Sequence, residues 1–140
     1  MYRNILVAIE NSDADHAVLE HVQGLARLTG ARLLLVHVAD GWVARHFDEL
    51  KLRESEEMRE DRAYLEKLCQ QLLSEGFDCR ARLAMGDPVT QLVKVAVEER
   101  VDLIALSTHG HRFFQDLLRG STADRLRHGV LVPVLMVRAR

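Results

Sequence analysis

The chain has 140 residues, of which 48% are hydrophobic and 29% are charged, and its formal net charge is −2. This length suits one domain, spanning residues 1–140. The small net charge gives no general attraction to nucleic acid or to an anionic membrane surface. The apolar runs "LLLVHVA" and "VLVPVLMV" fall well short of the roughly 20 residues of a membrane span. We therefore expect a cytoplasmic protein that binds neither nucleic acid nor membranes.

Apolar runs alternate with amphipathic segments along the first third of the chain. "NILVAIE" (4–10) and "ARLLLVHVAD" (31–40) predict buried strands, the second with His37 as a hydrogen-bonded interior side chain. Between them, Ser12 or Asp13 can cap a helix that Gly30 ends. Its expected apolar face consists of Ala17, Val18, Val22, Leu25 and Ala26.

The middle of the chain begins with a segment, 41–52, that has no clear period and contains Trp42, which could cover a pocket or fasten the loop to the core. A helix is predicted over 53–75, with an apolar stripe and with Asp61 among the charges of its exposed side. Gly76 ends it. The stripe consists of Met58, Leu65, Leu68 and Leu72.

The second half continues the same alternation. "FDCRARLAMG" (77–86) predicts a strand whose inward side chains are Phe77, Cys79, Ala81 and Leu83. A helix follows, with Asp87 as its cap and Pro88 in its first turn. "DLIALS" and "VPVLMVR" predict two more strands. This order indicates an α/β fold with a doubly wound parallel sheet, in which ligands bind beyond the carboxyl ends of the strands.

One segment at such a strand end, 107–126, could bind phosphate. Gly110 and Gly120 enclose nine residues, and Ser121 then opens a predicted helix from Thr122 to His128. Free N–H groups at a helix N-terminus suit an anion. The same pattern fits a plain loop followed by an ordinary helix cap.

Several other chemistries lack their motifs. The sequence has no GxxxxGK[ST], no GxGxxG after a strand and no evident Ser-His-Asp arrangement, so no catalytic residue is assigned. Cys69 and Cys79 are expected to be reduced and partly buried rather than a disulfide or metal site. His109 and His111 could touch phosphate or metal, or lie in solvent, and two histidines alone make a poor metal site.

The segment around Gly110 and Gly120-Ser121 resembles the universal stress protein family. Nucleotide-binding members of that family carry G-x2-G-x9-G-[ST] after the fourth strand, and this chain has Ser107 in place of the first glycine. "ILVAIENSD" resembles the family's first strand and turn, with Glu10 where aspartate is usual. "MGDP" and "VPVLMVR" are also similar, so the resemblance covers essentially the whole chain.

This resemblance implies the fold of the adenine nucleotide alpha hydrolases, with five strands in the order 3-2-1-4-5. It also implies a stress-response regulator with little or no turnover, which binds ATP or a related adenine nucleotide, usually with Mg²⁺, and forms a homodimer through the strand Val132–Val137. Carried onto this sequence, the nucleotide site consists of Ala8, Glu10, Val38, Leu106, Ser107, His109, Gly110, Gly120, Ser121 and Thr122.

Two alternatives remain at this point. Ser107 and Glu10 motivate a nucleotide-free dimeric interaction module of the same fold. An enzyme, such as an ATPase or a nucleotidyl transferase, is the other alternative, but the sequence offers no evident general base for it.

Overall fold

The computed structural model describes residues 1–40, 47–107, 126 and 128–139. Within these residues the elements follow one another as β1 (Asn4–Ala8), α1 (Ala14–Thr29), β2 (Arg32–Asp40), α3 (Phe47–Ser74), β3 (Cys79–Gly86), α4 (Pro88–Glu98), β4 (Leu103–Ser107) and β5 (Val134–Val137). Of the predicted helix from Thr122 to His128, positions 126 and 128 are described, and both are helical.

The strands form one parallel sheet in the order β3-β2-β1-β4-β5, which confirms the expected fold. The chain moves outward from β1 through β2 to β3 and then returns to the other side of β1 with β4. The order therefore reverses between β1 and β4. In a sheet of this kind, the carboxyl ends of the strands beside that reversal border the usual ligand crevice.

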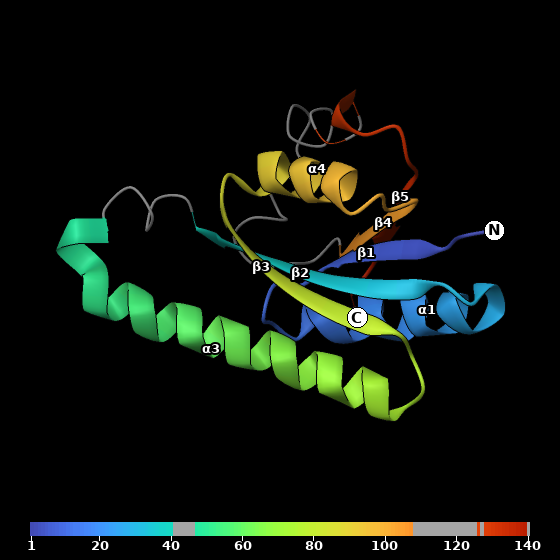
Figure 1. The fold of residues 1–140 in the computed structure, drawn as a ribbon, viewed down its shortest axis with the longest axis horizontal. Helices are drawn as coiled ribbons and strands as arrows, with labels where there is room; N and C mark the ends of the chain where they lie inside the picture. The colour runs from blue at the N-terminus through green and yellow to red at the C-terminus, as the bar shows by residue number, and fades with distance from the viewer. Residues whose placement is uncertain (41–46, 108–125, 127, 140) are drawn as a thin grey trace.

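Helices cover both faces of the sheet, with α1 and α3 on one side and α4 on the other (Figure 1). Successive side chains of a strand point to opposite faces, so Ile5 and Val7 belong to the cluster under α1 and α3, whereas Leu6 and Ala8 belong to the cluster under α4. Every residue of β1 is buried. This burial on both faces explains why the strand reads as a continuous apolar run.

Two predicted helix boundaries are confirmed. Gly30 follows α1 with a φ of 75°, and its N–H donates to the carbonyl of Ala26 at 2.7 Å. Glycine adopts this left-handed backbone without a steric penalty. At the start of α4, the carboxylate of Asp87 accepts the N–H of Thr90 at 2.9 Å, and Pro88 occupies the first turn.

The long helix α3 begins at Phe47, earlier than the predicted residue 53. Its first turns extend past the carboxyl ends of β2 and β3 (Figure 1), so the described sheet does not require an apolar stripe there. Leu, Glu and Lys in "FDELKL" nevertheless have good helix propensity. Periodicity therefore failed to reveal this part of the helix.

The prediction for β3 is wrong at Ala81, which is exposed, whereas Ala84 is buried. Phe77 and Cys79 pack into the cluster under α1 and α3, as expected, but Ala84 packs into the cluster under α4. Leu83 also packs against the cluster under α1 and α3, as expected, so both faces of this edge strand are covered around residues 83 and 84, which a strict alternation does not anticipate.

Candidate functional site

Three of the predicted site residues meet at the carboxyl ends of neighbouring strands. Ala8 of β1, Val38 of β2 and Leu106 of β4 belong to one buried cluster on the α4 side of the sheet. Each is at most 3% exposed. We call these three residues the floor; they lie beside the point where the strand order reverses, the usual place for a ligand in such a sheet.

Ser107 is also buried, with 1% of its surface exposed, but it belongs to the other face of β4. Leu103 and Ala105 pack in the cluster under α1 and α3, and Leu106 packs under α4. Alternation along the strand therefore directs the Ser107 side chain toward the α1 layer. Its extra Cβ, compared with the family's glycine, thus points away from the floor at Leu106.

The loop between β1 and α1 is organised by a buried carboxylate that the sequence did not single out. Asp15, which is 1% exposed, accepts backbone N–H groups from Glu10 at 2.9 Å, Asn11 at 2.9 Å and Ser12 at 3.1 Å. Asn11 has a φ of 67°, which turns successive N–H groups toward one point. This arrangement is an anion-binding nest of backbone groups, and the chain fills it with its own carboxylate.

The start of α1 follows from the same arrangement. Asp13 occupies the cap position, but its side chain makes no capping hydrogen bond. The hydroxyl of Ser12 instead accepts the N–H of Ala14 at 3.3 Å and donates to the carboxylate of Glu10 at 3.1 Å. Of the two predicted caps, Ser12 therefore provides the side-chain contact. It also positions the carboxylate of Glu10.

A second buried polar group links the sheet to α3. Nδ1 of His37 donates to the carbonyl of Ile9 at 2.8 Å, and Nε2 lies 3.2 Å from Oδ2 of Asp61. The side chain of Asn11 donates to the other oxygen of Asp61 at 3.1 Å. This confirms that His37 is a hydrogen-bonded interior side chain, and it places α3 in contact with the β1–α1 loop.

Burial alone lowers the pKa of His37, but the hydrogen bonds to Asp61 and Ile9 and the charges of Asp61 and Asp15 outweigh it, so the pKa is raised. For Asp61, burial alone raises the pKa, but the hydrogen bond and charge of His37, with the hydrogen bond from Asn11, lower it. Both shifts favour the charged form of each partner.

The expectation that Asp61 lies on an exposed helix side is wrong, since its side chain is 13% exposed. A signal was present in the sequence. Asp61 precedes Leu65 by four positions and Leu68 by seven, so it continues the apolar stripe of α3. Tyr64, on the same side, donates its hydroxyl to Asp15 at 2.8 Å. Polar residues in register with an apolar stripe can thus indicate a buried network.

Half of the predicted site lies outside the described residues. This half consists of His109, Gly110, Gly120, Ser121 and Thr122. Their assignment to the nucleotide remains a prediction. Trp42, which was not assigned to the site, also lies outside the described residues. Among the described residues, no group of three or more His, Cys, Asp or Glu side chains could hold a metal ion.

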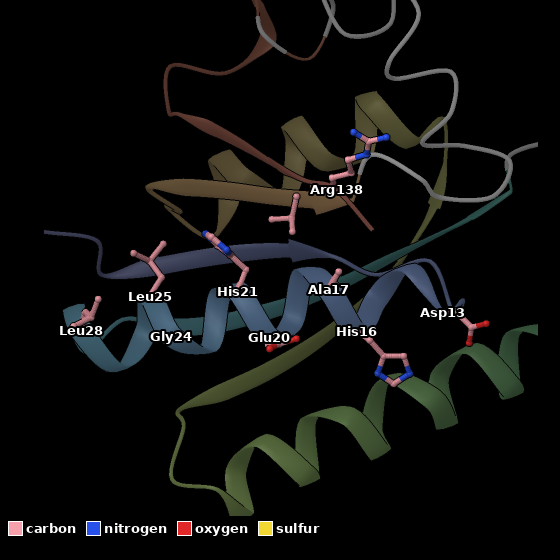
Figure 2. Close-up of a pocket in the computed structure, with 10 residues that line it drawn as sticks. Asp13, His16, Ala17, Glu20, His21, Gly24, Leu25, Leu28 and Arg138 are labelled. Carbon is pink, nitrogen blue, oxygen red and sulfur yellow. The ribbon is translucent and has the colours of Figure 1, made fainter. Parts of the chain in front are cut away.

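A groove of about 710 Å³ follows α1 from its N-terminus to its last turn, beside the end of β5 (Figure 2). Ala17 and Leu25, predicted as core, line it and are half-buried. Asp13, His16, Glu20, His21 and Arg138 contribute polar side chains of both charges.

Two smaller expectations can also be compared with the structure. Cys69 and Cys79 are free, as predicted, and they are buried rather than partly buried; the thiol of Cys69 donates to the carbonyl of Cys79 at 3.2 Å. In the part of the chain that the structure describes, no helix has both the length and the apolar character to cross a membrane.

Comparison with known proteins gives extensive matches. Universal stress protein MJ0577 of Methanocaldococcus jannaschii is 26% identical over 160 residues, which cover 100% of this chain and 97% of the relative. The solved structure of MJ0577 matches with a TM-score of 0.81 over 100% of this chain and 98% of that chain.

Two more distant structures share the fold. A universal stress protein in complex with cAMP is 21% identical, with a TM-score of 0.67 over 98% of this chain and 97% of that one. The universal stress protein of Archaeoglobus fulgidus in complex with dAMP is 24% identical, with a TM-score of 0.68 over 97% of this chain and 98% of that one. The model of the universal stress protein family matches residues 1–138, so this chain belongs to that family.

Proposed function

We propose that this stress-response protein binds ATP, or a related adenine nucleotide, at the carboxyl ends of its strands and acts as a regulator with little or no turnover. The observation that carries the proposal is the convergence of Ala8, Val38 and Leu106 on one buried floor beside the strand-order reversal. The family membership and the cAMP and dAMP complexes of two fold neighbours support an adenine nucleotide as the ligand.

The occupied nest in the β1–α1 loop favours one orientation of the nucleotide. Asp15 already accepts the N–H groups of Glu10, Asn11 and Ser12, so this loop has a carboxylate where a phosphate would otherwise bind. We infer that the loop faces the nucleoside and that the phosphates, with Mg²⁺, bind at the segment from His109 to Thr122. A helix N-terminus alone contributes about 0.3–2 kcal/mol to an anion, so the nucleoside must supply much of the affinity.

We also propose a cytoplasmic homodimer that pairs through Val132–Val137. Within the described sheet, β5 is an edge strand, and Met136 is 41% exposed on it. An apolar edge strand is prone to pair with another strand. This observation keeps a second candidate function open, a dimeric interaction module that binds no nucleotide.

Calorimetric titration of the nucleotide-free protein with Mg-ATP tests the main proposal. We expect saturable binding near one nucleotide per subunit, and loss of binding in Gly120→Val without loss of fold. Gly24→Val is the matched control, because a Cβ at Gly24 meets nothing within 4 Å. Absence of heat in the wild type would favour the interaction module, and unchanged affinity in Gly120→Val would contradict the phosphate assignment.

Turnover is tested in the same preparation. We expect release of inorganic phosphate from Mg-ATP to stay far below typical enzyme rates of about 10 per second. Sustained release at such rates would contradict a regulatory, non-enzymatic role. A parallel sedimentation measurement, with Met136→Lys as the edge variant, tests whether β5 forms the dimer.

A further inference from the structure

His37 lies between two groups that can only accept hydrogen bonds. Its Nδ1 is 2.8 Å from the carbonyl oxygen of Ile9, and its Nε2 is 3.2 Å from a carboxylate oxygen of Asp61. A neutral imidazole has one N–H, whereas an imidazolium has two. Both contacts are therefore hydrogen bonds only when the ring carries a proton on each nitrogen. His37 is 7% exposed, so water does not readily replace either partner.

These contacts join α3 to the loop that faces the candidate nucleotide. Ile9 directly follows β1, and Asp61 lies in the middle of α3. The second oxygen of Asp61 accepts from the side chain of Asn11, inside the loop, at 3.1 Å. A continuous chain of hydrogen bonds thus runs from Ile9 through His37 and Asp61 to Asn11, and it fixes both ends of this turn against the helix.

We propose that His37 is a proton-controlled link between α3 and the β1–α1 loop, through which pH regulates binding of the adenine nucleotide. The inference rests on the proposed function. When the ring loses a proton, a nitrogen lone pair faces either the carbonyl of Ile9 or the carboxylate of Asp61, so one contact must break. The loop then loses a constraint, and nucleotide binding has to restore it at a cost in affinity.

The ionisable groups around His37 set where this happens. Asp61 faces it from α3, and Asp15 contributes its charge from α1. Tyr64 of α3 donates to Asp15 and stays protonated, because burial and the charge of Asp15 raise its pKa. Glu10 and Asp13 are the ionisable groups of the loop itself. The β3 residue in register with His37 is Leu83, which has no charge.

Burial alone would lower the pKa of His37, but the bonds to Asp61 and Ile9 with the charges of Asp61 and Asp15 raise it. The doubly protonated ring therefore persists at pH values where an ordinary histidine is neutral. The link should open as pH rises through this raised pKa, on the alkaline side of the usual value of 6.5.

The test measures Mg-ATP affinity by calorimetry from about pH 5.5 to about pH 9, a range that spans histidine titration. We expect the wild-type affinity to fall about fivefold or more as pH rises, the lower end of typical coupling between two sites. In Asp61→Asn the fall should move to lower pH, because the imidazolium loses its charged partner. His37→Asn should remove this pH dependence, since its amide donates to Ile9 but does not titrate.

His21→Asn is the matched control, because His21 is an exposed histidine of α1 and should keep the wild-type profile. Subtracting the His37→Asn profile from the wild-type profile removes the titration of ATP itself and leaves the contribution of His37. Nitrogen NMR of the wild-type histidines, which needs no variant, should show both ring nitrogens of His37 protonated at neutral pH.

The outcomes separate the two proposals. Binding whose pH profile is the same in the wild type, Asp61→Asn and His37→Asn would overturn the proton-controlled link and leave the proposed function intact. A neutral His37 ring at pH 6 would also overturn it. Absence of Mg-ATP binding at every pH would overturn the proposed function and, with it, the regulation inferred here.

Discussion

The hydroxyl of Tyr64, in α3, donates a 2.8 Å hydrogen bond to a carboxylate oxygen of Asp15, in α1. This bond joins residues 49 positions apart and fastens the long helix to the group that holds the β1–α1 loop. Burial and the negative charge of Asp15 both raise the pKa of Tyr64, so the phenol keeps its proton and remains a donor.

Tyr64→Phe should lower the free energy of unfolding by about 1.5 kcal/mol, the lower end for a hydrogen bond to a charged group. The loss stays moderate because Asp15 keeps its backbone donors from Glu10, Asn11 and Ser12. Urea denaturation of the wild type and the variant measures the difference. Tyr2→Phe is a suitable control for removal of a tyrosine hydroxyl elsewhere, and equal stability of Tyr64→Phe and wild type would contradict the role of the bond.

Asp15→Ala should cost more, about 3 kcal/mol, because it leaves three part-buried N–H groups and the hydroxyl of Tyr64 without their acceptor. It also empties the nest. We therefore expect sulfate to raise the melting temperature of Asp15→Ala more than that of the wild type, since an anion can replace the missing carboxylate. Sodium chloride at matched ionic strength is the control. An identical sulfate response in both proteins would show that the loop collapses rather than forming an open nest.

The pair of His37 and Asp61 should give stability a definite pH dependence. Because the folded-state pKa of His37 is raised, its contribution is complete below the ordinary value of 6.5 and is lost as pH rises through the raised pKa. Because the folded-state pKa of Asp61 is lowered, its contribution is complete above 3.8 and is lost as pH falls through the lowered pKa.

The stability difference between the wild type and Asp61→Asn should therefore be largest between pH 3.8 and 6.5 and shrink on either side. Urea denaturation at a series of pH values measures it. A difference that stays constant across this series would mean that the pair contributes through shape alone and not through its charges.

Cys69 and Cys79 should resist modification in the native protein. Both side chains are buried, and burial, with the neighbouring Cys69, raises the pKa of the Cys79 thiol. The thiolate is the reactive form, so a chromogenic disulfide reagent should react slowly until the protein unfolds. In denaturant the same reagent should titrate both cysteines. Rapid reaction of the folded protein would contradict the burial of these thiols.

The sequence predicted the order of elements well because strands and helices of this fold carry strong local signals. The fully buried strand β1 is a continuous apolar run in the sequence. The glycine at position 30 marks the end of α1, and the aspartate at position 87 marks the start of α4. Prediction failed where the hydrophobic pattern of a segment does not reflect its surroundings in the folded protein. The early turns of α3 are helical without an apolar stripe, and Ala81 of β3 is exposed despite its inward position in the alternation.

Residue types and their spacing along the chain were enough to predict the fold class, the family resemblance and the apolar residues that end the strands. Two contacts became evident only in the folded chain: Asp15 fills the nest of the β1–α1 loop, and Asp61 contacts His37. The contacts of Asp15 are local, but they require the left-handed backbone at Asn11, which residue type alone does not dictate. Asp61 and His37 are distant in sequence, and the packing of α3 on the sheet brings them together. A carboxylate that looks like surface charge in the sequence thus becomes a buried partner through packing.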